Sequence, residues 1–540
     1  MRQLDLLTWP LLSPFLRWRH ARVALQVPIL LLTAMVVFDG LAGPQLAPKN
    51  LATVGVWLHY RGLVVLALLI AGNLFCMACP FMLTRRAGRW LREHRFGGGR
   101  AVPAGLRKWL VIGLLVAFFY CYEVFSLWAS PWLTAWLILG YFLTAFTVDT
   151  FFRGAAFCKH VCPVGHFNFF GSLVSPLEIK TRSQATCAAC QTKNCISASS
   201  DVMLSGSVSR FSLRKNTSEA SRAARDSSLI SRRDAPLAVD PLRVTAGVIP
   251  SKRASYAGAR GCELWLFQPR KAGNMDCTFC LDCIHACPYD NVGVIGRIPT
   301  SELWSDPFRS GIGRFSQRHD LIALVLLFSF GAFINAFAMI RPVYGLQAQL
   351  ARWLGTSVRA PGLAIIFLIG LVLLPAALVT LAGLGTHLLV GSNRVSISSA
   401  IGRYVYALVP MGFGMWLAHY AFHFLTGGLT IIPVVQSFLA DVGLFGGRVG
   451  WGLGPLVPAD WLFPIEAMLL YLGATGSLIA VFQIARDQLG DQGPGARQAV
   501  LRSALPWALL VLLMLAAGLW ILVQPMEMRG TMMMPGPAGG

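Results

Sequence analysis

Charged residues are scarce in this sequence. They make up 13% of the 540 residues, whereas a typical soluble domain has about 25%. Acidic residues are the scarcer kind, with 24 Asp and Glu against 46 Lys and Arg, while hydrophobic residues reach 55%. This composition excludes a set of ordinary soluble domains, and most of the chain is expected to lie in lipid.

Two familiar sequence signals are also missing. No glycine-rich nucleotide fingerprint occurs in a strand-turn-helix context, so a self-contained NAD- or flavin-dependent enzyme is not indicated. The first apolar run follows a polar-flanked start of 22 residues and has no small-x-small cleavage site. We therefore expect this run to stay as a membrane anchor and not to be removed as a signal peptide.

Long apolar runs are abundant. A helix of roughly 20 apolar residues crosses the hydrocarbon of a bilayer, and nine runs of this kind predict a predominantly α-helical integral membrane protein with about nine transmembrane helices. The runs cover about residues 23–43, 62–83, 108–128, 131–152, 320–340, 361–383, 404–425, 461–485 and 504–524.

The basic residues predict the orientation of these spans. With the N-terminus inside, 39 of the 46 Lys and Arg fall in inner segments, counting Lys108 at the inner edge of its span, and none falls further inside a proposed span. The positive-inside rule then predicts a multi-pass protein of a bacterial-type inner membrane, with its C-terminus on the outer side. Because the charge collects on one face, we attribute it to contact with anionic lipid and not with nucleic acid. The same face would attract an acidic redox partner, such as a soluble ferredoxin or flavodoxin.

The chain divides into three main parts and a tail. A four-helix membrane block is expected at 1–152, a polar cytoplasmic segment at 153–319, and a five-helix membrane block at 320–525. Within the polar segment, 197–260 is rich in Ser, Ala and Arg, and is interpreted as an extended or disordered insertion. A Met-rich outer tail occupies 526–540.

The strongest motif lies in the polar segment. Cys277, Cys280, Cys283 and Cys287 are spaced C-x2-C-x2-C-x3-C and are followed by Pro288. In this bacterial ferredoxin pattern three thiolates bind one [4Fe–4S] cluster and the fourth binds the other cluster of a pair. A zinc site would more naturally show two CxxC pairs separated by a longer loop. The pattern therefore predicts a cytoplasmic, two-cluster ferredoxin-like α+β domain.

A second group of cysteines supplies the other site. Cys187, Cys190 and Cys195, together with Cys287, form one set of four. Cys277, Cys280 and Cys283 then lack a fourth ligand, and Cys262 is the only unassigned cysteine nearby. We assign it by elimination. The alternative is that Cys262 is a buried structural thiol and that the cluster has three ligands or is completed from another segment.

Two further cysteine pairs each precede a proline at the inner edge of the membrane. Cys76 and Cys79 end before Pro80, and Cys158 and Cys162 end before Pro163. These pairs could bind a metal or a further cluster, exchange thiol and disulfide, or pack without chemistry. Cys121, alone among aromatic residues, is interpreted as packing.

Ionisable residues within membrane spans are functional candidates because their burial in lipid is costly. Five such residues fall toward the outer half of their spans: Asp39, Glu123, His419, His423 and Glu466. The two histidines are spaced i,i+4 and share a helix face, which suits a proton-handling quinone site or a metal site; hydrogen bonding between helices is the alternative. The methionines of the tail are soft ligands suited to copper, unless the tail is simply an untethered terminus.

The arrangement of these motifs resembles the NapH/NosR-type membrane polyferredoxins. The resemblance covers roughly residues 62–300 and is carried by Cys158-x3-Cys162-Pro163 and by the run from Cys277 to Pro288. The first pair departs from the family pattern, because Cys76-x2-Cys79 is one residue shorter. The resemblance implies electron transfer linked to the quinone pool or to the assembly of a respiratory metalloenzyme.

The sequence thus supports two main hypotheses. The first is an electron-transfer component of an oxidoreductase system, such as a subunit of a quinone reductase or quinol dehydrogenase. Its two clusters would connect a cytoplasmic reductant with quinone or an outer-face acceptor. The second is an accessory or maturation protein that supplies electrons for assembling copper or another metal centre in a respiratory enzyme. A redox-sensing regulator ranks last, because no output domain is recognisable.

Overall fold

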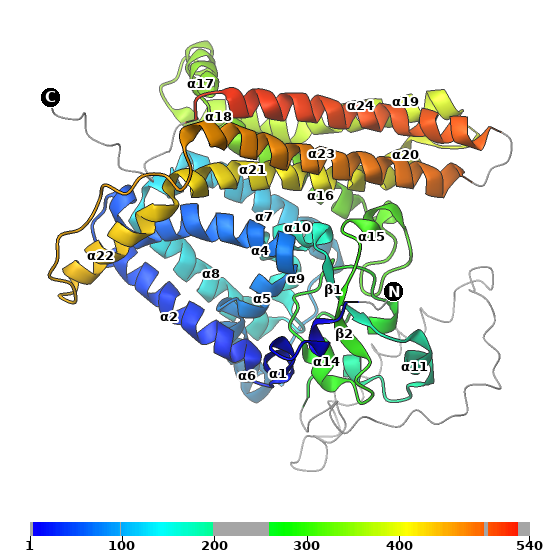
Figure 1. Cartoon of the computed structure of the whole chain (residues 1–540), viewed down its shortest axis with the longest axis horizontal. Coiled ribbons are helices and arrows are strands. Elements are labelled where there is room, and N and C mark those ends of the chain that lie inside the picture. Colours follow the sequence, from blue (N-terminus) through cyan, green and yellow to red (C-terminus); the bar gives the residue numbers. More distant parts are fainter. Residues whose placement is uncertain (1–3, 98, 198–258, 392, 491–494, 527–540) are drawn as a thin grey trace.

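The computed structural model describes residues 4–97, 99–197, 259–391, 393–490 and 495–526. The insertion expected at 197–260 and the Met-rich tail lie almost entirely outside the described residues. The described chain is mostly helical and contains one small sheet of two strands. In Figure 1 the long C-terminal helices lie along the top, with the N-terminal helices and the sheet below them.

The second membrane helix begins earlier than the sequence predicts. Asn50 caps it by accepting a hydrogen bond from the backbone N–H of Ala52 at 2.8 Å. The carboxylate of Asp39 accepts another from the N–H of Leu51 at 2.6 Å. These acceptors satisfy N–H groups that a helix start leaves open, so the helix starts at Leu51 and not near residue 62.

The same helix also ends earlier. It passes through a π-helical stretch, η3 (Val54–Tyr60), into α4 (Arg61–Ala71), and ends at Gly72, whose φ is +62°. Arg61 consequently lies near the middle of a candidate span, where the sequence analysis placed no basic residue. The elements of the N-terminal part are α1 (Leu12–Arg17), α2 (Ala21–Ala42), α3 (Leu51–Thr53), η3, α4, α5 (Leu74–Ala78), α6 (Phe81–Arg95), α7 (Ala104–Val124) and α8 (Pro131–Phe151).

The chain between the two helical blocks consists of short elements around the sheet. Strands β1 (Leu177–Thr181) and β2 (Val292–Gly296) pair antiparallel, with Leu177 opposite Gly296 and Thr181 opposite Val292. The short helices are α9 (Ala156–His160), α10 (Pro163–Gly171), α11 (Gln184–Ala189), α12 (Asn194–Ser197), α14 (Asp282–Ala286) and α15 (Ser301–Trp304).

The C-terminal part is a bundle of long helices. Helix α21 packs on α23, α23 packs on α24, and α16 packs on α21; Figure 1 shows α21, α23 and α24 side by side. The elements are α16 (His319–Phe337), α17 (Arg341–Trp353), α18 (Arg359–Leu368), the π-helical η10 (Ile369–Leu373), α19 (Leu374–Val390), α20 (Ile397–Tyr404), α21 (Val409–Gly427), α22 (Ile431–Asp441), α23 (Ala459–Leu489) and α24 (Ala496–Val523).

Eight helical segments among the described residues are long and apolar enough to cross a membrane, one fewer than predicted. The difference is the expected span at 108–128. It forms α7, whose described apolar part, Trp109–Val124, is shorter than the other eight segments. The eight segments are Ala21–Ala42, Leu51–Ala71, Pro131–Phe151, His319–Phe337, Arg359–Val390, Ile397–Asp441, Ala459–Leu489 and Ala496–Val523.

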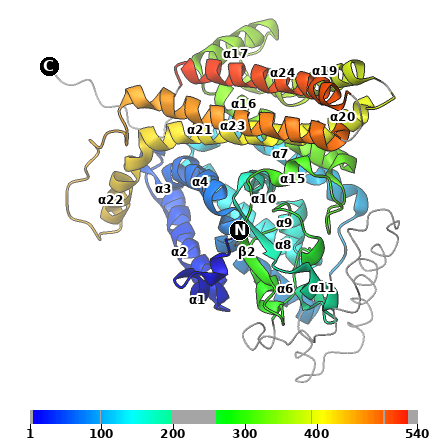
Figure 2. The same cartoon turned by 45° about the vertical axis from the view of Figure 1, so that its right-hand side comes forward.

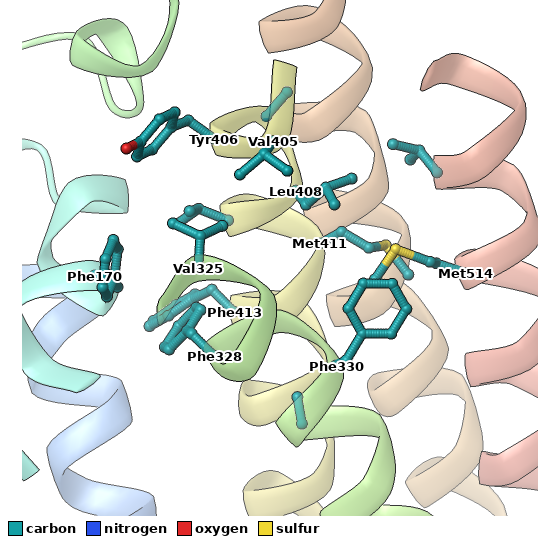
Figure 3. Close-up of a cluster of buried hydrophobic side chains, with 14 of the residues drawn as sticks. Phe170, Val325, Phe328, Phe330, Val405, Tyr406, Leu408, Met411, Phe413 and Met514 are labelled. Atoms are coloured by element: carbon teal, nitrogen blue, oxygen red, sulfur yellow. The ribbon is translucent and has the colours of Figure 1, made fainter. Parts of the chain in front are cut away.

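One hydrophobic core joins the N-terminal and C-terminal helices through α10. Figure 3 shows Phe170 of α10 facing Phe328 of α16 and Phe413 of α21, with Met514 of α24 further along the same cluster. The rings of Phe170 and Phe328 have centroids 5.9 Å apart. Helix α10 is therefore held in place by large buried side chains of the C-terminal bundle.

The N-terminal segment and the cysteine-bearing segment lie at one end of the helices. Gly296 of β2 donates its N–H to the carbonyl of Leu4 at 2.7 Å, and Arg17 makes a bidentate contact with Asp290 at 2.9 and 3.0 Å. Met526 lies at the other end, where it bridges to Ile340 beyond the end of α16. The two ends of the described chain thus lie at opposite ends of α16.

Candidate functional site

The structure brings Cys187, Cys190, Cys195 and Cys287 to one small cavity. Cys187 lies on α11, Cys195 lies on α12, and Cys190 and Cys287 directly follow α11 and α14. Short helices that end at a cysteine turn the chain back on itself, so residues about 100 positions apart in sequence meet here. This is the first thiol set.

Hydrogen-bond donors surround the sulfurs of the first thiol set. The side-chain amide of Asn291 donates to Cys187 Sγ at 3.2 Å, and its backbone N–H donates to Cys287 Sγ at 3.3 Å. Hydrogen bonds to sulfur are among the features with which a protein tunes an iron–sulfur cluster. The surroundings of this set therefore suit thiolates that bind a cluster.

Cys262, Cys277, Cys280 and Cys283 form the second thiol set. Three of them belong to one buried cluster, and Cys283 lies within electrostatic range of the other three. Left-handed backbone at Phe279 (φ 52°) and Leu281 (φ 63°) coils the Cys277–Cys283 loop tightly. Non-glycine residues rarely adopt this conformation, so the packing of the loop must enforce it.

Cys262 of the second set contacts the first set. Its N–H donates to the carbonyl of Cys195 at 2.8 Å, and burial raises the pKa of its thiol to about 11. The neighbouring Glu263 contacts Arg89 at 2.8 Å and Arg85 at 3.5 Å. Burial alone would raise the pKa of Glu263, but these two guanidinium groups hold it below its usual range.

In the part of the chain that the structure describes, no three His, Cys, Asp or Glu side chains are grouped closely enough for one metal ion. A single ion requires all its ligands around one point. In a [4Fe–4S] cluster each thiolate binds a different iron.

The two proline-terminated pairs form a third thiol set, Cys76, Cys79, Cys158 and Cys162. Cys79 lies within electrostatic range of Cys76 and Cys158, and Cys162 lies within range of Cys158 and Cys79. Figures 1 and 2 show α9 and α10, which carry or follow the second pair, between the C-terminal helices and α11. The pairs are about 80 residues apart in the sequence but meet in the fold.

Arg85 is a residue of this region that the sequence analysis missed. It is fully buried, forms an ion pair with Asp149 of α8, and approaches Cys158 Sγ to 3.3 Å with Nη1. In the sequence, Arg85 is only one of many basic residues expected at the inner face. Only its position in the sequence, five residues after Pro80, could have indicated a role at the cysteine pair. A cation near a cysteine pair favours the thiolate.

A cavity of about 650 Å³ opens beside α9. Its basic lining residues include Arg107, Lys159 and Arg318, and Asp276 and Asp320 supply acidic groups. Apolar walls come from Val111, Leu321 and Leu324 among other residues. Binding sites for small organic molecules commonly measure 300–1,000 Å³ and combine apolar walls with a few polar groups.

The candidate residues within the spans are all buried. The rings of His419 and His423 on α21 meet edge to face with centroids 4.8 Å apart, and Glu466 lies on the neighbouring α23. Glu123 instead lies near Arg61. The structure therefore brings the two histidines together and gives Glu123 a basic neighbour that the sequence did not predict.

Arg61 is surrounded by aromatic rings. Its guanidinium lies 4.3 Å from the ring centroid of Trp57, 4.6 Å from that of Tyr122 and 5.8 Å from that of Tyr420. Tyr420 belongs to α21, so Arg61 connects the N-terminal and C-terminal helices. A charged residue buried in a span is a functional candidate. The sequence did not indicate this role, because the apolar run predicted as the second span starts directly after Arg61.

Comparison with known proteins finds one weak similarity. The chain is 27% identical over 157 residues to the methylamine utilization ferredoxin-type protein MauN of Paracoccus denitrificans (strain Pd 1222). The similar region is 27% of this chain and 53% of MauN, so the chain spans about half the length of the curated relative it matches. No family model and no solved structure matches the chain. The similarity is to a ferredoxin-type protein and does not single out the NapH/NosR-type group.

Proposed function

We propose that this chain is a membrane electron carrier that holds two [4Fe–4S] clusters. Cys187, Cys190, Cys195 and Cys287 bind one cluster, and Cys262, Cys277, Cys280 and Cys283 bind the other. The clusters pass single electrons between a cytoplasmic reductant and quinone or an outer-face acceptor. The similarity to a ferredoxin-type protein and the eight apolar helical segments among the described residues support membrane-bound electron transfer.

The observation that carries the proposal is the arrangement of eight thiols into two adjacent sets of four. Cys195 and Cys262, one from each set, share a backbone hydrogen bond of 2.8 Å. Adjacent clusters exchange electrons readily because tunnelling weakens with distance. When bound, the clusters supply one-electron chemistry; the chain supplies the thiolates, the N–H donors of Asn291 and the burial that set their potentials.

The donor side of the proposal is a basic groove beside the second thiol set. The groove has a volume of about 540 Å³ and includes Cys280 in its lining. Its lining contains five arginines, namely Arg19, Arg22, Arg86, Arg89 and Arg260. The acidic or potentially acidic lining residues are three, namely Glu93, Asp282 and Cys280. A positive groove at a redox site favours an acidic donor such as ferredoxin or flavodoxin through electrostatic steering.

Charge reversal tests the groove. We expect Arg19→Glu with Arg86→Glu to slow reduction of the clusters by reduced ferredoxin at least about tenfold at low salt, because steering contributes 10-fold or more to association rates. The control is Arg497→Glu with Arg502→Glu, which makes the same charge change on exposed positions of α24. Equal rates in both variants, measured by stopped-flow absorbance, would mean that the donor docks elsewhere.

The cavity beside α9 is the best candidate for the binding site of the electron acceptor. It is large enough for a quinone ring, and its lining combines apolar residues with Lys159 and Asp276, whose charged groups are 3.8 Å apart. An acceptor there would lie on the same side of the protein as the thiol sets. This choice avoids electron transfer across most of the bilayer, which an acceptor near His419, His423 and Glu466 would require.

Metal analysis and redox titration test the proposal. Anaerobically purified protein is expected to contain at least about eight iron atoms and eight acid-labile sulfides per chain, from two cubes of four each. Dithionite should bleach its visible absorbance, and a soluble quinone analogue should restore it. Protein that binds zinc without labile sulfide contradicts the clusters, and reduced clusters that quinone does not reoxidise contradict the quinone branch.

A further inference from the structure

We propose that the third thiol set, Cys76, Cys79, Cys158 and Cys162, holds a third iron–sulfur cluster at the inner edge of the membrane helices. This inference rests on the proposed function, because the third cluster exchanges electrons with the second. It gives a defined chemistry to two cysteine pairs whose roles the sequence left open, and it extends the two clusters into a series of three.

The first observation is that three short helices bring the four thiols together. Cys76 lies on α5, Cys79 ends it, Cys158 lies on α9, and Cys162 is the N-cap of α10. Cys158 and Cys162 share a buried cluster with Phe81, which follows the first pair. Four cysteines are the ligand set of both [2Fe–2S] and [4Fe–4S] clusters, in which the thiolates bind more than one iron.

The second observation is the set of donors around these sulfurs. The N–H of Gly165 donates to Cys162 Sγ at 3.2 Å, and the backbone N–H of Phe81 lies close enough to Cys79 to interact with its thiol. The side-chain amide of Asn168 approaches Cys76 Sγ to 3.7 Å. Two prolines therefore start two helices whose first N–H groups point at sulfur, as anion-binding helix starts do.

The third observation is the buried cation at the site. Arg85 Nη1 lies 3.3 Å from Cys158 Sγ, and the residue is fully buried. Burying a guanidinium is costly unless it faces negative charge. Asp149 and Glu263 supply negative charge to Arg85. Its Nη1 also lies beside the sulfur of Cys158, where a cation would stabilise a thiolate that binds a cluster.

The fourth observation is a direct link to the second thiol set. Asn73 is fully buried, and its side-chain amide donates to the carbonyl of Cys277 at 2.8 Å. The Oδ1 of the same side chain lies 3.7 Å from Cys76 Sγ. One amide group thus connects a ligand of the second set with a ligand of the third.

The redox step along this link is a transfer of one electron. The cluster of the second set is oxidised by one electron and that of the third set is reduced by one electron, while no bond forms or breaks and no proton moves. The cytoplasmic reductant supplies the electron. The cavity beside α9, the helix that carries Cys158, offers the site for the next acceptor.

Iron content tests the third cluster. Purified wild-type protein is expected to contain about twelve iron atoms per chain, or about ten if the third cluster is [2Fe–2S]. The double variant Cys76→Ser and Cys158→Ser should fall to about eight and lose one of three electron paramagnetic resonance signals. Cys121→Ser is the matched control, since it removes a thiol of α7 outside the three sets, and it should keep the wild-type content.

The outcomes separate this inference from the proposed function. Eight iron atoms in both the wild type and the double variant would contradict the third cluster and leave the proposed two-cluster carrier intact. One zinc ion bound at these cysteines would have the same meaning. Protein without iron overturns both. If the double variant does not accumulate, Asn168→Leu provides the test. Loss of a donor to Cys76 should lower the midpoint potential of one signal, and three unchanged potentials would overturn the assignment.

Discussion

Asn291 shows how a single side chain organises the first thiol set. It donates to the sulfurs of Cys187 and Cys287 through its amide and its backbone. It also exchanges hydrogen bonds with the backbone of Ser183, accepting at 2.9 Å and donating at 2.7 Å. Because Ser183 precedes α11, these bonds hold the helix that carries Cys187 against the segment that follows Cys287. The position of Asn291 beyond Pro288 gives no hint of this role in the sequence.

Asn291→Asp is expected to lower the midpoint potential of the first cluster. The change keeps the acceptor for Ser183 but removes the N–H donor and adds negative charge, and both effects disfavour the more negative reduced cluster. A lost hydrogen bond worth about 1 kcal/mol corresponds to ~40 mV. A redox titration followed by electron paramagnetic resonance measures the shift. The signal of the second cluster serves as the internal control, and an unchanged first signal would contradict the role of Asn291.

Arg61 acts at the junction of the two helical blocks. Its contacts with three aromatic rings and its hydrogen bond to the hydroxyl of Tyr122 at 3.3 Å depend on a planar guanidinium. Lysine carries the same charge but cannot stack or share its charge among the rings in this way. We therefore treat Arg61 first as a residue that stabilises the packing of α4 against α7 and α21.

Arg61→Lys is expected to destabilise the protein by about 1–2 kcal/mol, the range of desolvated cation–π contacts. The thermal unfolding midpoint in detergent measures the loss. Arg359→Lys, at the exposed start of α18, is the control and should leave the midpoint unchanged. Equal midpoints for both variants would show that the rings contribute little.

At the scale of elements, the cysteine pairs behave alike despite their different spacing. Cys79-Pro80 opens α6 and Cys162-Pro163 opens α10, and in each case an N–H of the new helix points back at the cysteine sulfur. Proline is favoured at a helix start because it needs no donor there. The difference of one residue between the pairs falls before the Cys-Pro step, so it does not change this arrangement.

The N-terminal segment is a further element that supports the first thiol set. Arg17 binds Asp290, three residues after Cys287, and Asp5 binds Arg182 at 2.7 Å.

We expect Arg17→Ala to speed the loss of the first cluster in air about fivefold, the factor that corresponds to ~1 kcal/mol. Absorbance decay measures it. Arg95→Ala, an exposed change at the end of α6, should match wild type, and an equal rate for Arg17→Ala would contradict this support.

At the scale of the whole molecule, the described chain has its two ends on opposite sides. Leu4 lies beside β2 with the thiol sets, and Met526 lies beside Ile340 beyond the far end of α16. Because α16 is one of the candidate spans, these positions are expected on opposite faces of a membrane. The excess of basic residues predicts that the Leu4 side faces the cytoplasm.

Reporter fusions test this topology. Green fluorescent protein should fluoresce when fused before residue 1 and should stay dark when it is exported after Met526. Alkaline phosphatase should show the reverse pattern, with activity only at the position after Met526. Fluorescence at both positions would contradict the orientation, since it would leave both ends in the cytoplasm.

The sequence by itself determined the features that depend on local spacing. Apolar length predicts most of the spans, because a helix must satisfy its own backbone in lipid. Ligand spacing predicts the first two thiol sets, because a ferredoxin loop wraps its cluster over a few residues. The assignment of Cys262 rests on elimination and stays a prediction; its contact with Cys195 lies outside what the sequence could show.

The tertiary structure decided what depends on packing between distant segments. It moved the second span to Leu51–Ala71 and so placed Arg61 in its middle, because the caps at Asn50 and Asp39 come from a neighbouring loop and helix. It also brought Cys76 and Cys79 to Cys158 and Cys162, and Arg85 to Cys158. Separations of about 80 residues carry no local signal, so only the fold of the helices creates this site.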